Sequence, residues 1–213
     1  MSEFFQYVMK NWDIILQRTG DHVGLAFSAV ALACVVGIPI GLLITRNKKL
    51  ADGVIGLANI VQTIPSLAMF AMAIPLLGIG AKNAIFALFL YALLPIIKNT
   101  YIGIKNVDPS IIEAAKGMGM SRFQILYQVE MPLAVAVIMG GVRIAAVTGI
   151  GVATIATLIG AGGLGTLIYQ GIGMVNYPMM FAGAVPAALL ALLTDFIIGR
   201  LEKLLTSKGI ATS

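Results

Sequence analysis

Residues 133–159 read LAVAVIMGGVRIAAVTGIGVATIATLI, and Arg143 is the single charged residue among them. A helix needs about 20 largely apolar residues to cross a bilayer, so this stretch is long enough to do so. Four further stretches share this character: residues 23–45, 54–77, 84–104 and 179–199. The sequence therefore predicts an all-α integral membrane protein with five transmembrane helices.

The composition of the whole chain leads to the same class. Hydrophobic residues make up 59% of the 213 residues and charged residues only 11%, whereas a soluble domain carries about 25% charged residues. The mean hydropathy is +0.98. This composition excludes a soluble enzyme, and the spans lack the cluster of His, Cys or acidic side chains that a membrane enzyme would need.

The basic residues predict how the spans are oriented. Ten of the 14 lie at the end of the first, third or fifth span or in the segment that follows it: Arg46, Lys48, Lys49, Lys98, Lys105, Lys116, Arg122, Arg200, Lys203 and Lys208. By the positive-inside rule, the amino terminus lies outside and the carboxyl terminus in the cytoplasm. Lys98 is then expected to extend its amine to the cytoplasmic interface. The net charge of +5 is a signal of topology, and no nucleic-acid partner is expected.

The ends of the chain flank this membrane domain. Residues 1–22 carry acidic residues and lack the features of a cleavable signal. Phe4, Val8, Trp12 and Ile15 recur at helical spacing, which favours an amphipathic helix in the outer interface, with a frayed polar lead-in as the alternative. The domains are thus an external lead-in (1–22), a membrane domain (23–199) and a cytoplasmic tail (200–213).

The long cytoplasmic loop, about residues 105–132, carries capping signals for two short helices. Asp108 can cap the first helix, with Pro109 at its first position, and Gly119 can end it in a left-handed conformation. Ser121 and Gln124 have the spacing of a capping box, which starts the second helix. Pro132 is expected to stop that helix.

This loop resembles the EAA motif of ABC importer permeases, in which two coupling helices contact the ATPase. The matching residues are Glu113, Ala114, Ala115, Gly119, Val129, Met131 and Pro132, with Val129 and Met131 in place of the usual Ile and Leu. Both exchanges keep apolar character. The resemblance implies a type I ABC importer permease fold in the cell membrane of a prokaryote.

A second resemblance concerns the solute. Residues 62–66 (QTIPS) and 160–165 (GAGGLG) are similar to those of the osmoprotectant permeases. That family imports glycine betaine, choline, carnitine and related quaternary amines. Membership implies an ATPase dimer, a second permease copy or a paralogue, and an external substrate-binding protein. A permease for another small solute, such as an amino acid, and an ungated pore subunit are the alternatives.

Polar residues of the second span suggest a translocation path. Asn59, Gln62, Thr63 and Ser66 lie at i, i+3, i+4 and i+7, which places them on one face of a continuous helix. Pro65 and Pro75 are expected to kink this helix and to act as a hinge. The alternative is that the stripe only forms hydrogen bonds to neighbouring helices.

The fourth and fifth spans contain a packing face and two ionisable residues. The small side chains of the packing face recur every four residues: Gly141, Ala145, Gly149, Ala153 and Thr157. Arg143 and Asp195 are the ionisable residues expected within membrane depth. We expect each to snorkel separately or to contact a partner subunit, and a pair between them is the alternative.

Several motifs predict no chemistry of their own. Residues 160–165 match G-x-G-x-x-G, but they follow a membrane span, so a tight turn or re-entrant backbone is expected and a dinucleotide site is not. The chain has no phosphate-binding loop, so ATP is expected to be hydrolysed by a partner ATPase and no cofactor to be bound here. His22 and Cys34 are expected to be ordinary packing or interface residues, and no metal site is predicted.

Overall fold

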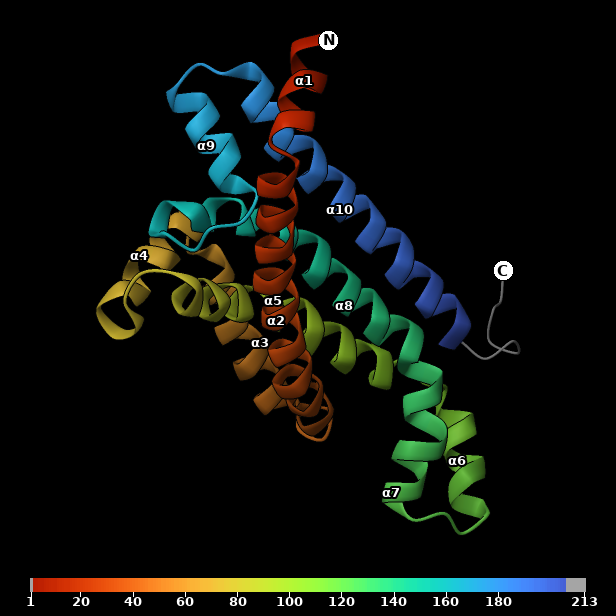
Figure 1. Ribbon diagram of the computed structural model, residues 1–213. Helices are drawn as coiled ribbons and strands as arrows, with labels where there is room; N and C mark the ends of the chain where they lie inside the picture. Colours follow the sequence, from red (N-terminus) through yellow and green to blue (C-terminus); the bar gives the residue numbers. More distant parts are fainter. Residues whose placement is uncertain (1, 206–213) are drawn as a thin grey trace.

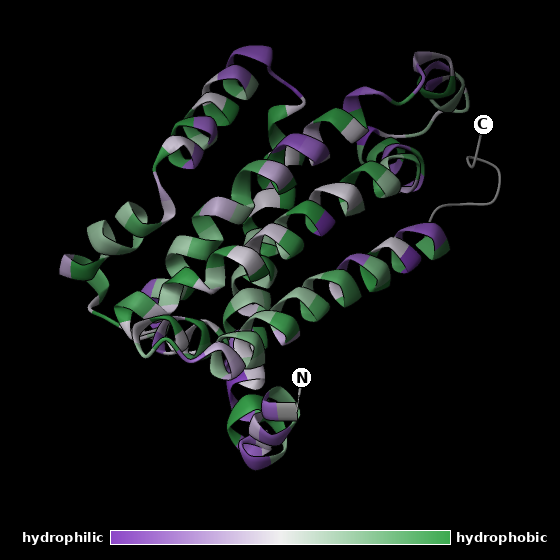
Figure 2. Cartoon of the chain, turned by 90° about the horizontal axis from the view of Figure 1, so that it is seen from above, coloured by the Kyte–Doolittle hydropathy of each residue, from purple (hydrophilic) through white to green (hydrophobic). Residues whose placement is uncertain are grey.

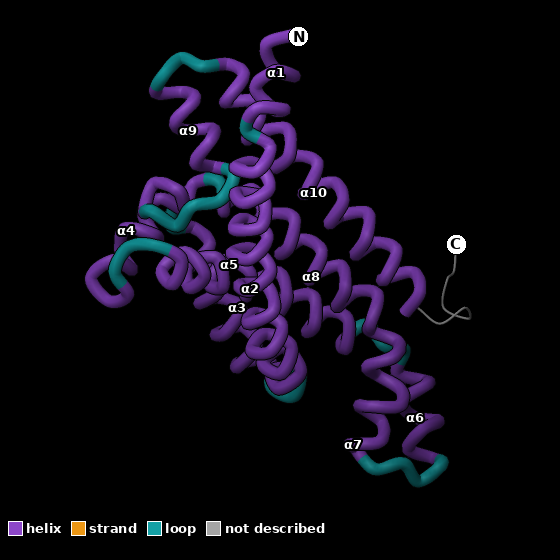
Figure 3. The backbone as a smooth tube through the Cα atoms, in the orientation of Figure 1, coloured by secondary structure: helices purple, strands orange, loops and turns teal. Residues whose placement is uncertain are grey.

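The computed structural model describes residues 2–205, and within that range the chain is helical with no strand. Figure 1 shows the order of the helices and Figure 3 the short connections between them. The helices are α1 (Ser2–Lys10), α2 (Trp12–Ile44), α3 (Lys48–Thr63), α4 (Ser66–Leu77), α5 (Ala81–Lys105), α6 (Pro109–Gly117), α7 (Arg122–Ile125), α8 (Met131–Ala153), α9 (Gly165–Gly173) and α10 (Tyr177–Leu205). A π-helical turn, η1 (Leu126–Glu130), precedes α8, and a 3-10 turn, η2 (Ile155–Ile159), follows it.

Four of the helical segments are long and apolar enough to cross a membrane, and α3 with α4 forms a fifth, broken candidate. The predicted all-α membrane protein is thus confirmed, and the five expected spans are reached if α3 and α4 together count as one. Viewed along another direction, most hydrophilic residues gather near the helix ends (Figure 2). Within the bundle, α5 packs against α2 and α8, and α8 also packs against α10.

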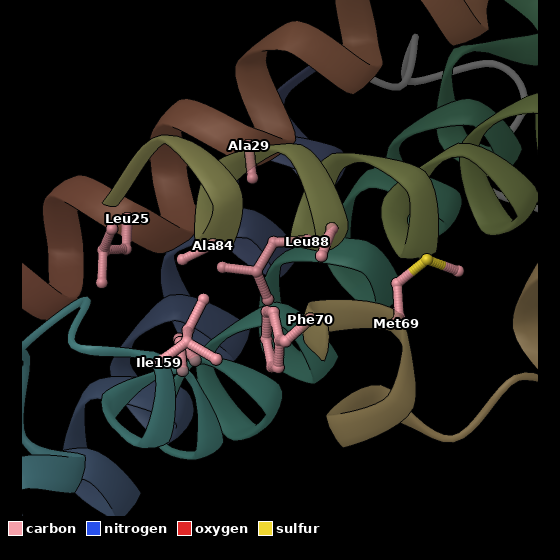
Figure 4. Close-up of a cluster of buried hydrophobic side chains, with 10 residues drawn as sticks. Leu25, Ala29, Met69, Phe70, Ala84, Leu88 and Ile159 are labelled. Atoms are coloured by element: carbon pink, nitrogen blue, oxygen red, sulfur yellow. The ribbon is translucent and has the colours of Figure 1, made fainter. Parts of the chain in front are cut away.

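A buried apolar cluster joins the broken span to the centre of the bundle. Phe70 of α4, Leu88 of α5 and Ile159 of η2 point toward one another (Figure 4), and each is almost fully buried. Leu25 and Ala29 of α2 complete this side of the core. Close packing of side chains is a main source of attraction between helices in a membrane, so this cluster holds α4 in place despite the break that precedes it.

The predicted packing face of α8 is confirmed where α8 meets α5. Gly141, Ala145 and Ala153 are buried, and a Cβ atom built at Gly141 would lie 2.6 Å from the carbonyl oxygen of Pro95. The absence of a side chain at Gly141 therefore allows the two backbones to approach closely, as small residues do in membrane helix pairs.

The second span differs from its prediction because it is not one kinked helix. The axes of α3 and α4 differ by 100° across the break. Ile64 and Pro65 are extended there, with ψ angles of 126° and 139°. The proline ring disfavours the helical conformation at the preceding residue, Ile64, and so ends α3 at this point. Pro75 causes no break: it lies in the last turn of α4, which continues to Leu77.

Three boundaries also differ from the sequence-based expectation. Helix α2 begins at Trp12 and not at residue 23, so part of the expected lead-in belongs to the first long helix. Residues 160–178, which connect the fourth and fifth expected spans, contain α9. Helix α10 continues to Leu205, into the expected tail, and residues 206–213, with Lys208, lie outside the described residues.

The amino-terminal segment is helical and packs on the protein itself. Phe4, Tyr7 and Val8 of α1 lie against Ile15 and against side chains of α9 and α10. Trp12, which shares their helical spacing, is exposed. The face of α1 that carries Phe4, Tyr7 and Val8 is therefore covered by the bundle.

The glycine-rich segment after α8 forms a tight turn, as predicted. Gly160, Gly162 and Gly163 have φ angles between 75° and 82°, a left-handed region that glycine enters without strain. The fully buried His22 lies against this turn, and its Nε2 donates to the carbonyl oxygen of Ile150 at 3.0 Å. His22 thus joins α2 to α8 and is the packing residue that was expected.

Arg143 and Asp195 do not snorkel separately but form a pair. The Nε of Arg143 donates to Oδ1 of Asp195 at 2.6 Å and its Nη2 donates to Oδ2 at 2.5 Å. Glu202 adds a third charge, 3.8 Å from Nη1 of Arg143. Because α8 and α10 pack along their lengths, they bring residues 52 positions apart into the bidentate geometry that arginine and carboxylate favour.

Replacement of Gly141 by alanine should destabilise the protein. The added methyl group would meet backbone atoms of α5, and such overpacking typically costs about 1–3 kcal/mol. The thermal unfolding midpoint of the purified protein in detergent measures this loss. Gly140→Ala is the matched control, because a Cβ atom there meets nothing within 4 Å. Equal midpoints for the two variants would contradict the close packing of α5 and α8.

Once one partner of the Arg143–Asp195 pair has been replaced, replacing the other should cause a smaller further loss of stability. A double-mutant cycle with Arg143→Ala and Asp195→Ala, read by thermal unfolding, should therefore give less-than-additive losses. The control is Arg200, which lies over the ring of Phe196 on α10, the helix that also carries Asp195. The stability losses of Arg200→Ala and Asp195→Ala should be additive. Additive losses for Arg143 and Asp195 would refute the pairing.

Candidate functional site

Helices α6 and α7 form a hairpin that projects beyond the bundle, at the end opposite α1 and α9 (Figure 1). Asp108 caps α6, since the N–H of Ser110 donates to Asp108 Oδ1 at 2.8 Å. This hydrogen bond lowers the pKa of the Asp108 carboxyl below its usual value, so the cap is ionised at neutral pH. Pro109 occupies the first turn, where its missing N–H leaves no helical bond unmade. The start of this helix is as predicted.

The turn between the two helices depends on Gly119. Its φ angle is 81°, and its N–H donates to Lys116 O at 2.9 Å, while the N–H of Met120 donates to Ala115 O at 3.2 Å. These two bonds make a Schellman motif, which satisfies carbonyl groups at the end of α6. A side chain at this φ angle is strained, so the tight turn requires glycine.

The second helix begins as predicted but does not end as predicted. Ser121 and Gln124 form both hydrogen bonds of the capping box, at 3.3 and 2.7 Å. Pro132 was expected to stop the helix, yet residues 122–153 run on as one helical segment. The π-helical turn before α8 is the reason: the N–H of Met131 bonds five residues back to Leu126, and this wider turn accommodates a residue without an N–H. The hairpin is therefore continuous with α8.

The hairpin brings the residues of the EAA-like segment together, with different exposures. Ala115 is buried inside the hairpin, Val129 and Met131 are half-buried at the π turn, and Pro132 is exposed. Glu113, Ala114 and Gly119 are exposed on the outside. Large apolar side chains are exposed beside them: Met118, Phe123 and Tyr127, the last two with ring centroids 4.7 Å apart. The hairpin thus presents an apolar surface with a nearby carboxylate at the tip of the molecule.

A cavity of about 400 Å³ opens between α3, α5 and α8. Its polar lining residues are Gln62, Tyr91, Lys98, Asn99 and Thr148, and the rest of its wall is largely apolar. The cavity lies beside the break in the second span, since its lining includes Gln62, two residues before the break at Ile64. It is the feature of the bundle best suited to receive a small solute.

Two hydrogen bonds join α5 to the end of α3, beside the cavity and the break in the second span. Gln62 Nε2 donates to the carbonyl oxygen of Tyr91 at 2.7 Å, and the Tyr91 hydroxyl donates to the carbonyl oxygen of Ile64. The free carbonyl group at the end of α3 is thereby satisfied, as an apolar setting requires. Tyr91 holds α3 and α5 in register at this point.

The structure brings only one of the four predicted path residues to this cavity. Gln62 lines it, whereas Asn59 is exposed outside it and Thr63 donates to Ile60 O within its own helix. Ser66 begins α4 beyond the 100° bend, so the i+7 relation on a continuous helix does not hold. The other polar lining residues were not identified as site residues. Lys98 could have been found, because an ionisable residue inside a span is a functional candidate by default.

A helical membrane bundle with a capped hairpin at one end and a polar cavity in its wall has the architecture of a transport permease. The model of the family described as "Binding-protein-dependent transport system inner membrane component" matches residues 37–207. The chain belongs to this family, whose members are permease subunits of ABC importers in the bacterial cytoplasmic membrane.

Curated relatives match nearly the whole chain. The carnitine transport permease protein OpuCB of Listeria monocytogenes is 44% identical over 99% of this chain and 96% of its own length. The glycine betaine/carnitine/choline transport system permease protein OpuCB of Bacillus subtilis is 43% identical over 99% and 97%. The osmoprotectant import permease protein OsmW of Salmonella typhimurium is 44% identical over 96% and 97%.

Solved structures share the fold. An inward-facing structure of the MetNI methionine ABC transporter has a TM-score of 0.82 at 26% identity, over 91% of this chain and 96% of that chain. An amino acid ABC transporter crystallised with histidines has a TM-score of 0.73 at 18% identity. The predicted type I ABC importer permease fold is therefore confirmed.

Proposed function

We propose that this chain is the membrane permease subunit of an ATP-driven importer of quaternary-amine osmoprotectants such as glycine betaine, carnitine and choline. The observation that carries the proposal is similarity over at least 96% of the chain to permeases named for these solutes. The amino-acid alternative has weaker support, since the methionine transporter is only 26% identical.

The α6–α7 hairpin is the docking site for an ATPase. A large apolar side chain such as Met118 or Phe123 would not remain exposed at a loop tip without a partner to cover it. The loop that contains the hairpin carries Lys105, Lys116 and Arg122, which supports a cytoplasmic location and the N-out, C-in orientation. The ATPase dimer supplies the ATP-binding residues that this chain lacks.

The wall containing the cavity faces a second permease copy or a paralogue. Polar and charged side chains inside a transmembrane helix are unfavourable when they face lipid. Gln62, Lys98 and Asn99, which line the cavity, therefore need a protein or aqueous environment. Two such walls facing each other would enclose a path for the solute. An external substrate-binding protein would deliver it from the side that carries α1 and α9.

The continuity of the hairpin with α8 is the basis for coupling. When the ATPase subunits approach each other, they displace the hairpin, and the single segment of residues 122–153 carries that displacement into the cavity wall. The Arg143–Asp195 pair transfers it to α10. ATP then shifts the population between inward-open and outward-open states.

Transport by the reconstituted complex tests this function. The permease, its ATPase and its binding protein in liposomes should take up radiolabelled glycine betaine, carnitine or choline only when ATP is present. Uptake that proceeds equally without ATP would indicate an ungated pore. Uptake of amino acids in place of quaternary amines would support the other permease class.

Replacement of Gly119 by valine should uncouple ATP hydrolysis from transport. A β-branched residue strongly disfavours the left-handed turn, so the hairpin would lose its shape while the spans still fold. We expect uptake per ATP hydrolysed to fall about tenfold, as measured in the same liposomes, if the altered turn costs about 1.4 kcal/mol in the docked state. Gly117→Val is the control, because Gly117 lacks a positive φ angle and has open space around it. Normal coupling in the Gly119 variant would argue against the hairpin as the transmission element.

A further inference from the structure

Arg143 of α8 and Lys98 of α5 differ in how their charges are balanced. Arg143 has the bidentate partner Asp195 and a second acid, Glu202. Lys98 forms no ion pair with any residue in the described range 2–205, and the cavity that it lines contains no aspartate or glutamate. A charge within a span is costly unless it is paired, so Lys98 calls for an anionic partner from outside this chain.

Lys98 lies inside α5 and not at its end. It is seven residues before the end of α5, or roughly 10 Å along the helix axis at about 1.5 Å per residue. Its neighbour Asn99 donates to Pro95 O at 2.7 Å, which leaves the side-chain oxygen of Asn99 as an acceptor. Lys98 is therefore the one cationic group of a cavity whose other polar groups are neutral.

The remainder of the cavity suits a methylated ammonium group. Tyr91 lines it and is held in place by its hydroxyl bond to Ile64 and by the bond of Gln62 to its carbonyl oxygen. Aromatic rings attract quaternary ammonium ions, and apolar walls such as those formed by Leu88 and Ile144 accept methyl groups. The volume of about 400 Å³ is within the range of about 300–1,000 Å³ typical of small-ligand sites.

We propose that this cavity is a solute-binding site within the permease itself, which favours zwitterions that carry a carboxylate and a quaternary ammonium group over quaternary amines that lack the carboxylate. Lys98 pairs with the carboxylate, and Tyr91 with the apolar wall receives the ammonium methyl groups. The inference rests on the proposed function, because the solutes concerned are those of osmoprotectant uptake. It also means that the permease discriminates among solutes independently of the external binding protein.

Equilibrium binding to the permease–ATPase complex in nanodiscs, without the binding protein, tests this site. The probes are radiolabelled glycine betaine, which has a carboxylate, and choline, which has none. Lys98→Gln should weaken binding of glycine betaine about tenfold or more, since it removes a charge-assisted bond. Binding of choline should not weaken, because choline has no carboxylate to pair with Lys98 and its own positive charge is repelled by the lysine.

Two further variants control the experiment. Lys105→Gln removes a positive charge from the same helix outside the cavity, and it should leave both affinities unchanged. Lys98→Arg keeps the charge and should retain much of the preference for glycine betaine, which excludes misfolding as the cause of the loss. Equal losses for both probes in Lys98→Gln, no loss, or no binding by the unaltered complex would each overturn the assignment.

These outcomes separate the site from the proposed function. If the complete transporter takes up quaternary amines with ATP and Lys98→Gln does not alter the preference, only the site is wrong. If the complete transporter takes up no quaternary amine, the proposed function fails as well.

Discussion

The close approach of α8 to α5 at Gly141 is the contact on which the functional arrangement depends. With no side chain at this position, the helix rests on the backbone of Pro95. Helix α8 is also the continuation of the projecting hairpin and a wall of the cavity. One packed helix therefore connects the surface that would meet an ATPase with the space that would hold a solute, and a tight interface transmits displacement because packed cores do not deform continuously.

Two charged sites within the helix bundle differ in whether an opposite charge of this chain balances them. The Arg143–Asp195 pair lies between α8 and α10, where bidentate hydrogen bonds satisfy both groups and hold the helices together. Lys98 has polar neighbours but no acid in the cavity lining. A charge inside a membrane is costly unless it is balanced. The Arg143–Asp195 pair therefore has a structural role, and the Lys98 charge is the one that we assign to solute binding.

Local signals in the hairpin were enough to predict most of its conformation. Asp108, Gly119 and the Ser121–Gln124 pair act through neighbours within a few residues, so the caps and the turn were confirmed. The expected stop at Pro132 was wrong because the π-helical turn redistributes the hydrogen bonds of an entire segment. The predicted polar stripe failed for a related reason: its spacing assumes a continuous helix, and the break at Pro65 separates Ser66 from the rest.

The sequence by itself determined the membrane class, the positions of the apolar segments and the capped hairpin, because hydrophobicity, chain length and helix capping act over short distances along the chain. Only the tertiary structure decided which side chains share a space. The pairing of Arg143 with Asp195, 52 residues away, and the gathering of Gln62, Tyr91 and Lys98 around one cavity follow from how helices cross. Those crossings depend on packing among all the helices at once, and no local pattern encodes them.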